Sequence, residues 1–257
     1  MSPHPTQDQS PADAFQTALT VMERRREKPR LTTGSRPLDE LLGGLEPGGF
    51  YLFYGPGEEE LDALLHRLVF EAVRHGPDAE AVYVLCGNYR RSRTMMDLDY
   101  LLALLAEAGL DVDHALSRVH MVYAFSERHL MRVPRLVEEA MGGAGTALVA
   151  VQQLTKLFYG PDAVRFEDPA EFTGVVSGLR RLCYERDAAL AATCRPAGGG
   201  LTPLPEGGAY LRHAATAMVY LRHTGSGEAS ARLVKHPESA RMGRRISLDG
   251  REAPWGG

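Results

Sequence analysis

The sequence lacks paired cysteines, a targeting signal and any long apolar run. Its three cysteines, Cys86, Cys183 and Cys194, form no CxxC pair. Such an odd, scattered set is typical of buried thiols in a reducing compartment, and not of a disulfide framework or a zinc site. The chain does not start with basic residues followed by an apolar stretch, and its longest apolar run, 100–106, is far too short to cross a membrane. We therefore expect a cytoplasmic protein with no metal site and no membrane contact.

An excess of positive charge is also missing. The chain has 29 Lys and Arg against 33 Asp and Glu, which gives a formal net charge of −4. A protein with this balance has no global positive field to hold nucleic acid or an anionic membrane. Any contact with nucleic acid must therefore be local. The basic clusters at 24–30, 90–93 and 241–245 are typical of solvated faces.

The order of apolar segments predicts an α/β fold. With 257 residues, 44% of them hydrophobic, the chain is long enough for one large domain or two small ones. Short apolar segments alternate with helical patterns, which indicates a mostly parallel central sheet flanked by helices. We expect strands at 49–55, 81–87, 118–125, 146–154 and 188–194, and helices at about 59–74, 95–109, 127–142 and 169–187. A C-terminal β-hairpin is predicted at 215–236, with a further strand at 246–248.

The amino-terminal part has the pattern of an arm joined to a core. Residues 1–12 are polar and contain proline, which predicts a disordered tail. Residues 11–28 carry apolar side chains at roughly helical spacing and end before Pro29, so they predict a helix. We therefore expect a tail and helical linker arm over residues 1–30 and one core domain over residues 31–250.

A strand, a glycine turn and a helix at 49–74 provide the context of a phosphate-binding loop without its chemistry. That loop follows the pattern G-x-x-x-x-G-K-[ST], in which backbone N–H groups, a lysine and a hydroxyl surround phosphates. Here Gly55 and Gly57 open the turn, but Glu60, Leu61 and Asp62 occupy the positions of the second glycine, the lysine and the hydroxyl. Like charges 4 Å apart repel by about 4 kcal/mol at an effective dielectric near 20. The turn, which contains no cation, therefore predicts that ATP is repelled.

The same acidic residues have a structural interpretation. Carboxylates at the start of a helix are favoured by about 0.3 to 1 kcal/mol, because they meet the positive end of the helix dipole and its free N–H groups. On this interpretation the protein's own side chains occupy the anion site, and the fold needs no nucleotide there.

Several segments, in order, resemble the strand-exchange recombinases of the RadA type in the RecA superfamily. Residues 31–55, LTTGSRPLDELLGGLEPGGFYLFYG, are similar to the entry to their core. Further similar segments are 81–93 (second core strand), 109–129 (third), 146–160 (Walker B strand), and 205–222 with 230–237 (closing segment). The resemblance covers about residues 15–248 by many weak motifs and implies a RecA-like core. The family's larger members carry an additional amino-terminal DNA-binding domain, for which residues 1–14 leave no room, so core plus arm resembles the shorter RadB-like paralogues.

The departures from the family fall on the residues that the resemblance implies for catalysis. Gln152 matches the magnesium-associated aspartate that ends the Walker B strand, and the water-activating glutamate maps to Gly87 or Asn88. The family's glutamine after the fifth strand maps near Arg195. Phosphoryl transfer depends on charge placement and metal, so these losses together leave no mechanism. We expect a pseudo-ATPase with degenerate Walker A and B motifs, no catalytic residues and no cofactor.

The resemblance also implies a partner. Family recombinases polymerise when an F-x-x-A motif before the core enters a pocket on the next subunit and adds a strand to its sheet. Phe15-Gln16-Thr17-Ala18 has this pattern, at a similar interval before residues 32–35. We expect Phe15 and Ala18 to bind a RadA-type recombinase or a second copy of this chain. The alternative is that Phe15 packs on its own core as part of a helix.

Two segments, roughly 159–169 and 195–209, match the family's DNA-contacting loops. The second is rich in glycine, and its composition predicts mobility. Its backbone N–H groups can meet phosphates, although a plain flexible loop is an equally good interpretation. The candidate contacts for weak, sequence-independent binding of single-stranded DNA are Arg195, Gly198, Gly199, Gly200, Gly207 and Gly208.

Taken together, the sequence predicts a catalytically inactive RadA-type paralogue that regulates homologous recombination or DNA repair by binding recombinase, single-stranded DNA or both. A RecA-superfamily ATPase of the KaiC-like group, with a nonstandard nucleotide site, is the alternative. A structural subunit of another assembly is a third interpretation.

Overall fold

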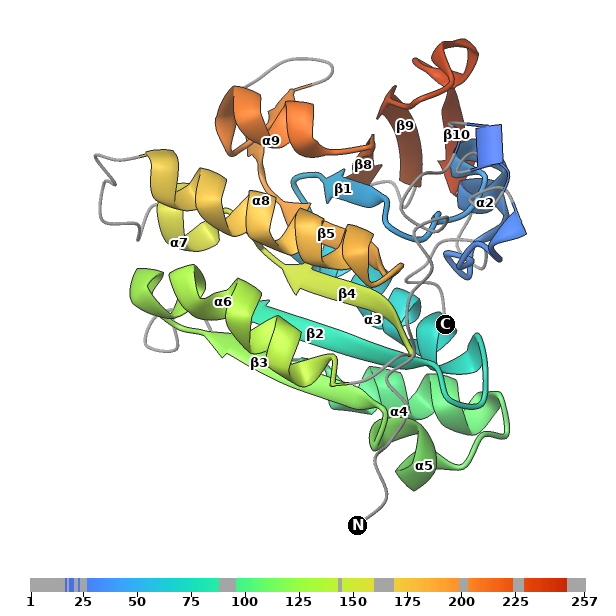
Figure 1. Cartoon of the computed structure of the whole chain (residues 1–257). Coiled ribbons are helices and arrows are strands. Elements are labelled where there is room, and N and C mark those ends of the chain that lie inside the picture. The colour runs from blue at the N-terminus through green and yellow to red at the C-terminus, as the bar shows by residue number, and fades with distance from the viewer. Residues whose placement is uncertain are drawn as a thin grey trace.

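The computed structural model describes residues 27–87, 96–142, 145–159, 169–198, 203–223 and 229–248, together with residues 17, 19, 20 and 23. An eight-stranded sheet forms the centre, with the strand order β10-β9-β8-β1-β5-β4-β2-β3, and helices lie on both of its faces (Figure 1). The predicted α/β fold, with a mostly parallel sheet flanked by helices and a C-terminal antiparallel strand pair, is confirmed. This arrangement is consistent with a RecA-like core.

The strands follow the expected order along the chain. The parallel ones are β1 (Phe50–Tyr54), β2 (Glu80–Cys86), β3 (Val119–Ala124), β4 (Thr146–Gln152), β5 (Ala189–Cys194) and β8 (Ala217–His223). The antiparallel strands β9 (Ala229–Lys235) and β10 (Arg245–Leu248) extend the sheet beyond β8. A separate short pair is made by β6 (Pro196–Ala197) and β7 (Leu204–Pro205).

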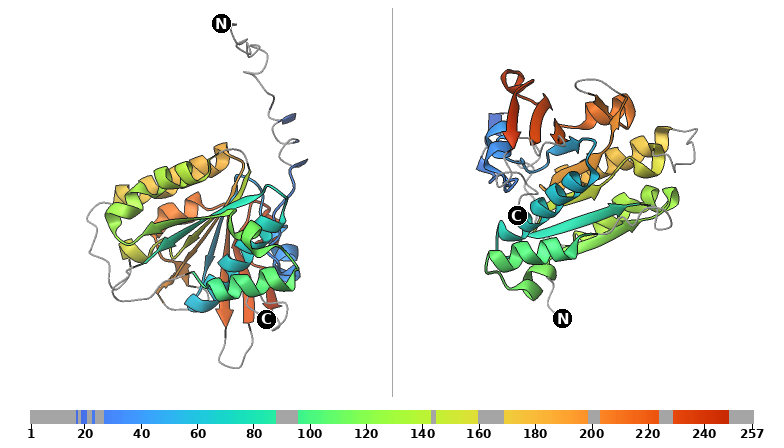
Figure 2. Two further views of the ribbon diagram at one scale, coloured as in Figure 1. Left: turned by 90° about the horizontal axis from the view of Figure 1, so that it is seen from below. Right: turned by 180° about the vertical axis from the view of Figure 1, so that it is seen from behind.

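The helices form two layers around this sheet (Figure 2). One layer contains α2 (Arg36–Leu42), α3 (Glu58–Arg74), α4 (Leu98–Glu107) and α5 (Val112–Leu116). The other contains α6 (Glu127–Ala140), α7 (Lys156–Tyr159), α8 (Pro169–Glu185) and α9 (Gly208–Ala214). A 3₁₀ turn spans Ser239–Arg241.

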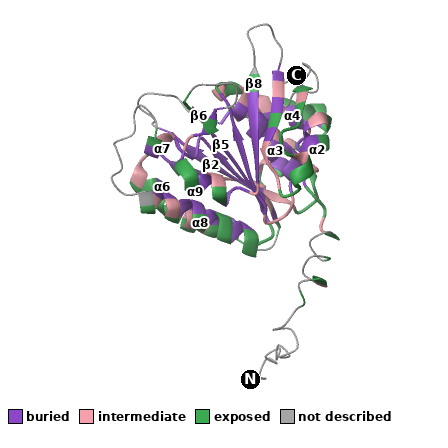
Figure 3. Ribbon diagram, turned by 90° about the horizontal axis from the view of Figure 1, so that it is seen from above, coloured by how far each residue is buried: buried purple, intermediate pink, exposed green. Residues whose placement is uncertain are grey.

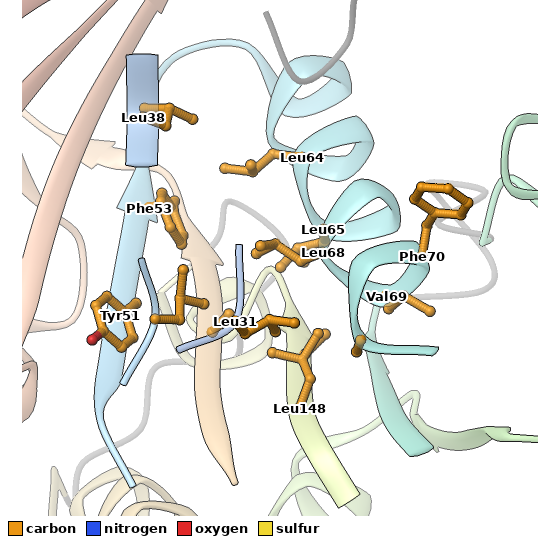
Figure 4. Close-up of a cluster of buried hydrophobic side chains, with 14 of the residues drawn as sticks. Leu31, Leu38, Tyr51, Phe53, Leu64, Leu65, Leu68, Val69, Phe70 and Leu148 are labelled. Atoms are coloured by element: carbon orange, nitrogen blue, oxygen red, sulfur yellow. The ribbon is translucent and has the colours of Figure 1, made fainter. Parts of the chain in front are cut away.

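Burial on both faces explains why the central strands are continuous apolar runs. All five residues of β1 and all six of β5 are buried, as expected for parallel strands covered on both sides. The helices are buried toward the sheet and exposed outward (Figure 3). Leu64, Leu65 and Leu68 of α3 point toward the sheet, where they share one cluster with Phe53 and Leu148 (Figure 4). Packing of α3 against this face of the sheet holds the first turn of α3 next to the end of β1.

The sequence patterns missed α2, α5, α7, α9 and the β6–β7 pair. Each is seven residues or shorter, so the hydrophobic period has too few turns to appear, and tertiary contacts stabilise these elements. In α9, for example, Lys235 Nζ of β9 donates hydrogen bonds to the carbonyl oxygens of Arg212, His213 and Ala215 at 2.9, 3.0 and 2.5 Å. This lysine satisfies the carbonyl groups that a helix leaves free at its end.

Only part of the arm is described. Leu19, Thr20, Glu23 and Glu27 are helical, and the backbone N–H of Thr20 donates to Thr17 Oγ1 at 3.1 Å. Phe15 and Ala18 lie outside the described residues, as do Asn88, Gly199, Gly200 and the hairpin turn at 225–227. The F-x-x-A prediction and the domain division at residue 30 therefore stay predictions. Within the described ranges, no helix is both long enough and apolar enough to cross a membrane.

Candidate functional site

The carboxyl ends of β1, β5, β4 and β2 meet at one edge of the sheet, where α/β proteins usually bind ligands. The end of β1 leads into the turn that begins at Gly55. A Cβ atom at this position would overlap the carbonyl oxygen of Leu221 in the neighbouring strand β8. The close packing of β1 on β8 therefore requires glycine here, independently of any phosphate.

The first turn of α3 is covered by its own acidic side chains. Gly57 is the N-cap residue and forms no side-chain capping bond, and Glu58, Glu59 and Glu60 follow it. The Glu60 side chain folds back so far that a Cβ atom on Gly57 would overlap Glu60 Oε2. A carboxylate thus lies against the glycine turn, where the helix dipole and the free N–H groups favour negative charge.

The structure brings together Asp62 and Gln152, two positions that the sequence singled out separately. Gln152 Nε2 donates a hydrogen bond to Asp62 Oδ2 at 2.5 Å, and the Tyr83 hydroxyl donates to Gln152 Oε1 at 3.1 Å. The Gln152 side chain is fully buried. An amide N–H group points toward Asp62 where a magnesium-nucleotide site needs an oxygen ligand. This arrangement does not fit a magnesium ion.

Burial also changes the acidity of Asp62. Desolvation raises the pKa of its carboxyl group from 3.8 to about 7, helped by the nearby charges of Glu58 and Glu59, while the Gln152 hydrogen bond and the Lys156 charge act in the opposite direction. Asp62 Oδ1 is buried and has no hydrogen-bond partner within the described residues. Ionising this carboxyl group inside the folded protein therefore costs free energy.

Lys156 is a charged residue of this site that sequence reasoning missed. It begins α7, four residues after Gln152, and its Nζ lies 3.4 Å from Glu58 Oε2 with the side chain 12% exposed. A positive charge from another element, α7, therefore does reach the turn. The sequence correctly indicated that residues 55–62 contain no cation, but it did not indicate this lysine. Lys156 could have been found from the sequence. It closely follows a predicted strand, and the carboxyl ends of parallel strands lie together, so residues just after these strands are candidates for the same site.

The base of the second loop is held by a charged cluster. Arg195 Nη2 lies 3.4 Å from Glu206 Oε1, and Thr155 Oγ1 donates to Glu206 Oε2 at 2.7 Å. The Arg195 side chain is 23% exposed. Since β6 and β7 pair directly after Arg195, this end of the loop is more ordered than its composition predicted. The ion pair offsets much of the charge that we had expected to face DNA.

The glycines of this loop fall into two groups. Gly207 is buried at φ +102°, and a Cβ atom there would press on Leu211 and Thr155, so packing and conformation both require glycine. Gly198 and Gly208 are exposed at positive φ with open space around them. Of the described candidate glycines, these two have backbones open to a ligand.

Gln153, beside Gln152, combines strain with burial. Its φ is +50°, in the left-handed region that non-glycine residues rarely adopt. The side chain is 1% exposed, and neither its Oε1 nor its Nε2 has a hydrogen-bond partner among the described residues. Strained residues tend to occur at functional sites. Gln153 is therefore a further candidate residue at the carboxyl ends of the parallel strands.

The sequence matches no protein-family model. In the part of the chain that the structure describes, no group of three or more His, Cys, Asp or Glu side chains is placed to hold a metal ion.

Proposed function

We propose that this chain is a catalytically inactive paralogue of the RadA-type recombinases, which regulates homologous recombination or DNA repair by binding recombinase, single-stranded DNA or both. The observation that carries the proposal is the self-filled phosphate turn. Glu60 folds over Gly57, and Asp62 bonds to Gln152, so the positions of phosphate and metal in an active relative contain the protein's own side chains. An ATPase core that has lost this chemistry retains its surfaces for binding partners.

The terminal strand of the sheet, β3, supports an interaction with a recombinase. β3 is the terminal strand and pairs only with β2 among the described strands. Tyr123 and Phe125, exposed and stacked with ring centroids 5.6 Å apart, lie at its carboxyl end. Edge strands accept an additional strand from a partner. In the proposed assembly, the arm of one molecule adds to the corresponding edge of the next.

Phe15→Ala should weaken binding to the host's RadA-type recombinase by about 2 kcal/mol or more, roughly 30-fold, as expected for an interface anchor. Isothermal titration calorimetry with and without single-stranded DNA measures this change. Leu19→Ala is the matched control, because Leu19 is an exposed arm residue outside the motif. If Phe15→Ala lowers the melting temperature but leaves recombinase binding intact, Phe15 is a core residue and the proposed arm contact is wrong.

We also expect weak, salt-sensitive binding to single-stranded DNA. With about three phosphate contacts, the slope of log K against log salt should be near −2. Arg195→Gln should flatten this slope by less than one unit. Glu206→Gln should strengthen binding, because it removes the carboxylate that pairs with Arg195. Fluorescence anisotropy with a labelled oligonucleotide reports both effects, and an absence of binding at low salt would restrict the protein to protein partners.

One observation favours the alternative ATPase. Lys156 brings a positive charge to the turn from outside the usual motif, and a lysine at that place can in principle contact a phosphate. Its ion pair with Glu58 must break first. Nucleotide-dependent stabilisation that is lost in Lys156→Gln would support this second function.

A further inference from the structure

The five residues that end β4 and begin α7, Gln152–Lys156, lie between the phosphate turn and the base of the second loop. We call this segment the connector. Gln152 donates its hydrogen bond to Asp62, and Lys156 Nζ lies 3.4 Å from Glu58 Oε2. Both partners lie near the start of α3, which carries the acids of the phosphate turn. The connector is therefore held to the turn at both of its ends.

Thr155 of the connector is held to the loop base, by which we mean Arg195, Glu206 and Gly207. The fully buried Thr155 donates its hydroxyl hydrogen bond to Glu206 Oε2 at 2.7 Å. A Cβ atom on Gly207, the N-cap residue of α9, would press on the Thr155 methyl group at 3.0 Å. Glu206 also pairs with Arg195 and donates its backbone N–H to the Arg195 carbonyl oxygen at 2.9 Å. Because close packing leaves little free space, a shift of Thr155 must move the loop base.

Gln153, near the middle of the connector, has a strained backbone and a buried side chain whose polar atoms lack partners among the described residues. Its conformation is held from outside. The Gln153 N–H donates to Thr193 Oγ1, and the Leu154 N–H donates to the Thr193 carbonyl oxygen, both at 2.9 Å. A left-handed backbone and unsatisfied buried polar atoms both raise the free energy of this conformation. A second conformation of the connector therefore needs little additional free energy.

We propose that the connector is a two-state element with Gln153 as its hinge, and that it couples the acids of the phosphate turn to the base of the second loop. In one state, the Lys156–Glu58 ion pair and the Thr155–Glu206 hydrogen bond are both formed. Loss of either contact lets the Gln153 backbone leave the left-handed region, which weakens the other contact. The coupling is reciprocal, as linkage requires. Its regulatory meaning rests on the proposed function, in which the second loop contacts single-stranded DNA, but the coupling itself does not.

Hydrogen exchange of the whole protein without any ligand, measured by mass spectrometry, tests the coupling. Glu58→Gln removes the ion pair with Lys156. We expect amide exchange in residues 204–214 to become about fivefold faster or more, because local opening determines exchange there. Among the described contacts, no hydrogen bond or ion pair joins Glu58 to these residues. Glu59→Gln, which removes an exposed carboxylate of the same turn, is the matched control and should leave this exchange unchanged. Unchanged exchange in β5 shows that neither variant unfolds globally.

The reverse experiment breaks the connection at the loop base. Thr155→Val keeps the shape of the buried side chain but loses the hydrogen bond to Glu206. We expect faster exchange near the start of α3, in residues 61–65. In the double variant with Glu58→Gln, exchange in residues 204–214 should be no faster than in Thr155→Val alone, because the connection is already broken.

Two substitutions of Gln153 test the hinge. Asparagine is enriched several-fold in the left-handed region, so Gln153→Asn should slow exchange at both ends of the connector about two- to threefold. Gln153→Val should accelerate it at both ends, because a β-branched residue disfavours that region. If Gln153→Val fails to fold, the asparagine variant decides the result by itself.

The proposal is overturned if Glu58→Gln changes exchange only in α3 and α7, or if Thr155→Val changes it only at the loop base, because the contacts would then be independent packing. It is also overturned if Gln153→Asn leaves exchange unchanged or accelerates it. Since the experiment contains no DNA and no recombinase, its failure leaves the proposed function intact. An absence of DNA binding in the anisotropy titration would likewise leave the coupling intact.

Discussion

Gly55→Ala should destabilise the protein by about 3 kcal/mol, the upper part of the range for inserting a group into a packed site. The added Cβ atom would overlap the carbonyl oxygen of Leu221. That oxygen belongs to the backbone of β8, so the two strands must separate to accommodate it. The expected loss follows from strand packing alone.

Gly57→Ala is the matched control, two residues further along the same turn. Its Cβ atom would overlap Glu60 Oε2, the far end of a flexible side chain that can rotate away. We therefore expect a cost below about 1 kcal/mol, and an even smaller one in the double variant with Glu60→Ala. Urea unfolding at neutral pH measures all three variants. Equal costs for the two glycines would contradict the packing role of Gly55.

Asp62→Asn should stabilise the protein at pH 8 by about 2 kcal/mol. Burial raises the pKa of Asp62 from 3.8 to about 7, so the ionised carboxylate is less stable in the folded protein than in the unfolded chain. A difference of about three pH units corresponds to about 4 kcal/mol at most, because each unit is worth 1.36 kcal/mol. Asparagine has no charge to desolvate, and its side-chain oxygen can still accept the hydrogen bond from Gln152.

The sign of the pH dependence follows from proton binding. Between about pH 4 and pH 7 the folded protein holds a proton on Asp62 that the unfolded chain has released, so the stability contributed by this group falls as the pH rises through that window. The advantage of Asp62→Asn should be near zero below pH 4 and constant above about pH 8. Glu59→Gln, which changes an exposed carboxylate of the same turn, should show little effect. If Asp62→Asn has the same effect at pH 4 and pH 8, the carboxyl group is not desolvated.

The strands that are buried on both faces were the most predictable from the sequence. The strands expected at 81–87 and 188–194 correspond to β2 and β5 within one residue at each end, because strands covered on both faces must be apolar throughout. The edge strand β3 also lies within one residue of the expected 118–125 at each end. Helix α4 was expected from residue 95 but begins at Leu98. The side chain of Asp97 caps it by accepting a hydrogen bond from the backbone N–H of Tyr100, a start signal that the apolar pattern alone does not include.

The candidate site was predictable as a set of positions but not as a set of contacts. The sequence identified Glu60, Asp62 and Gln152 individually as departures from a phosphate site. Their actual partners come from distant parts of the chain: Asp62 bonds to a residue 90 positions away, and Glu58 pairs with Lys156 across 98 positions. No local pattern encodes such separations.

The phosphate turn is filled by the protein's own acids and should not bind nucleotide. The most direct test is the melting temperature of the protein with and without millimolar Mg-ATP. We expect no change beyond that caused by magnesium chloride, and no release of phosphate from ATP. A ligand at a hundred times its dissociation constant adds about 2.7 kcal/mol of stability. A rise in melting temperature that corresponds to this gain in stability, and that is abolished by Lys156→Gln, would show that the turn binds nucleotide. It would contradict the proposed loss of nucleotide binding.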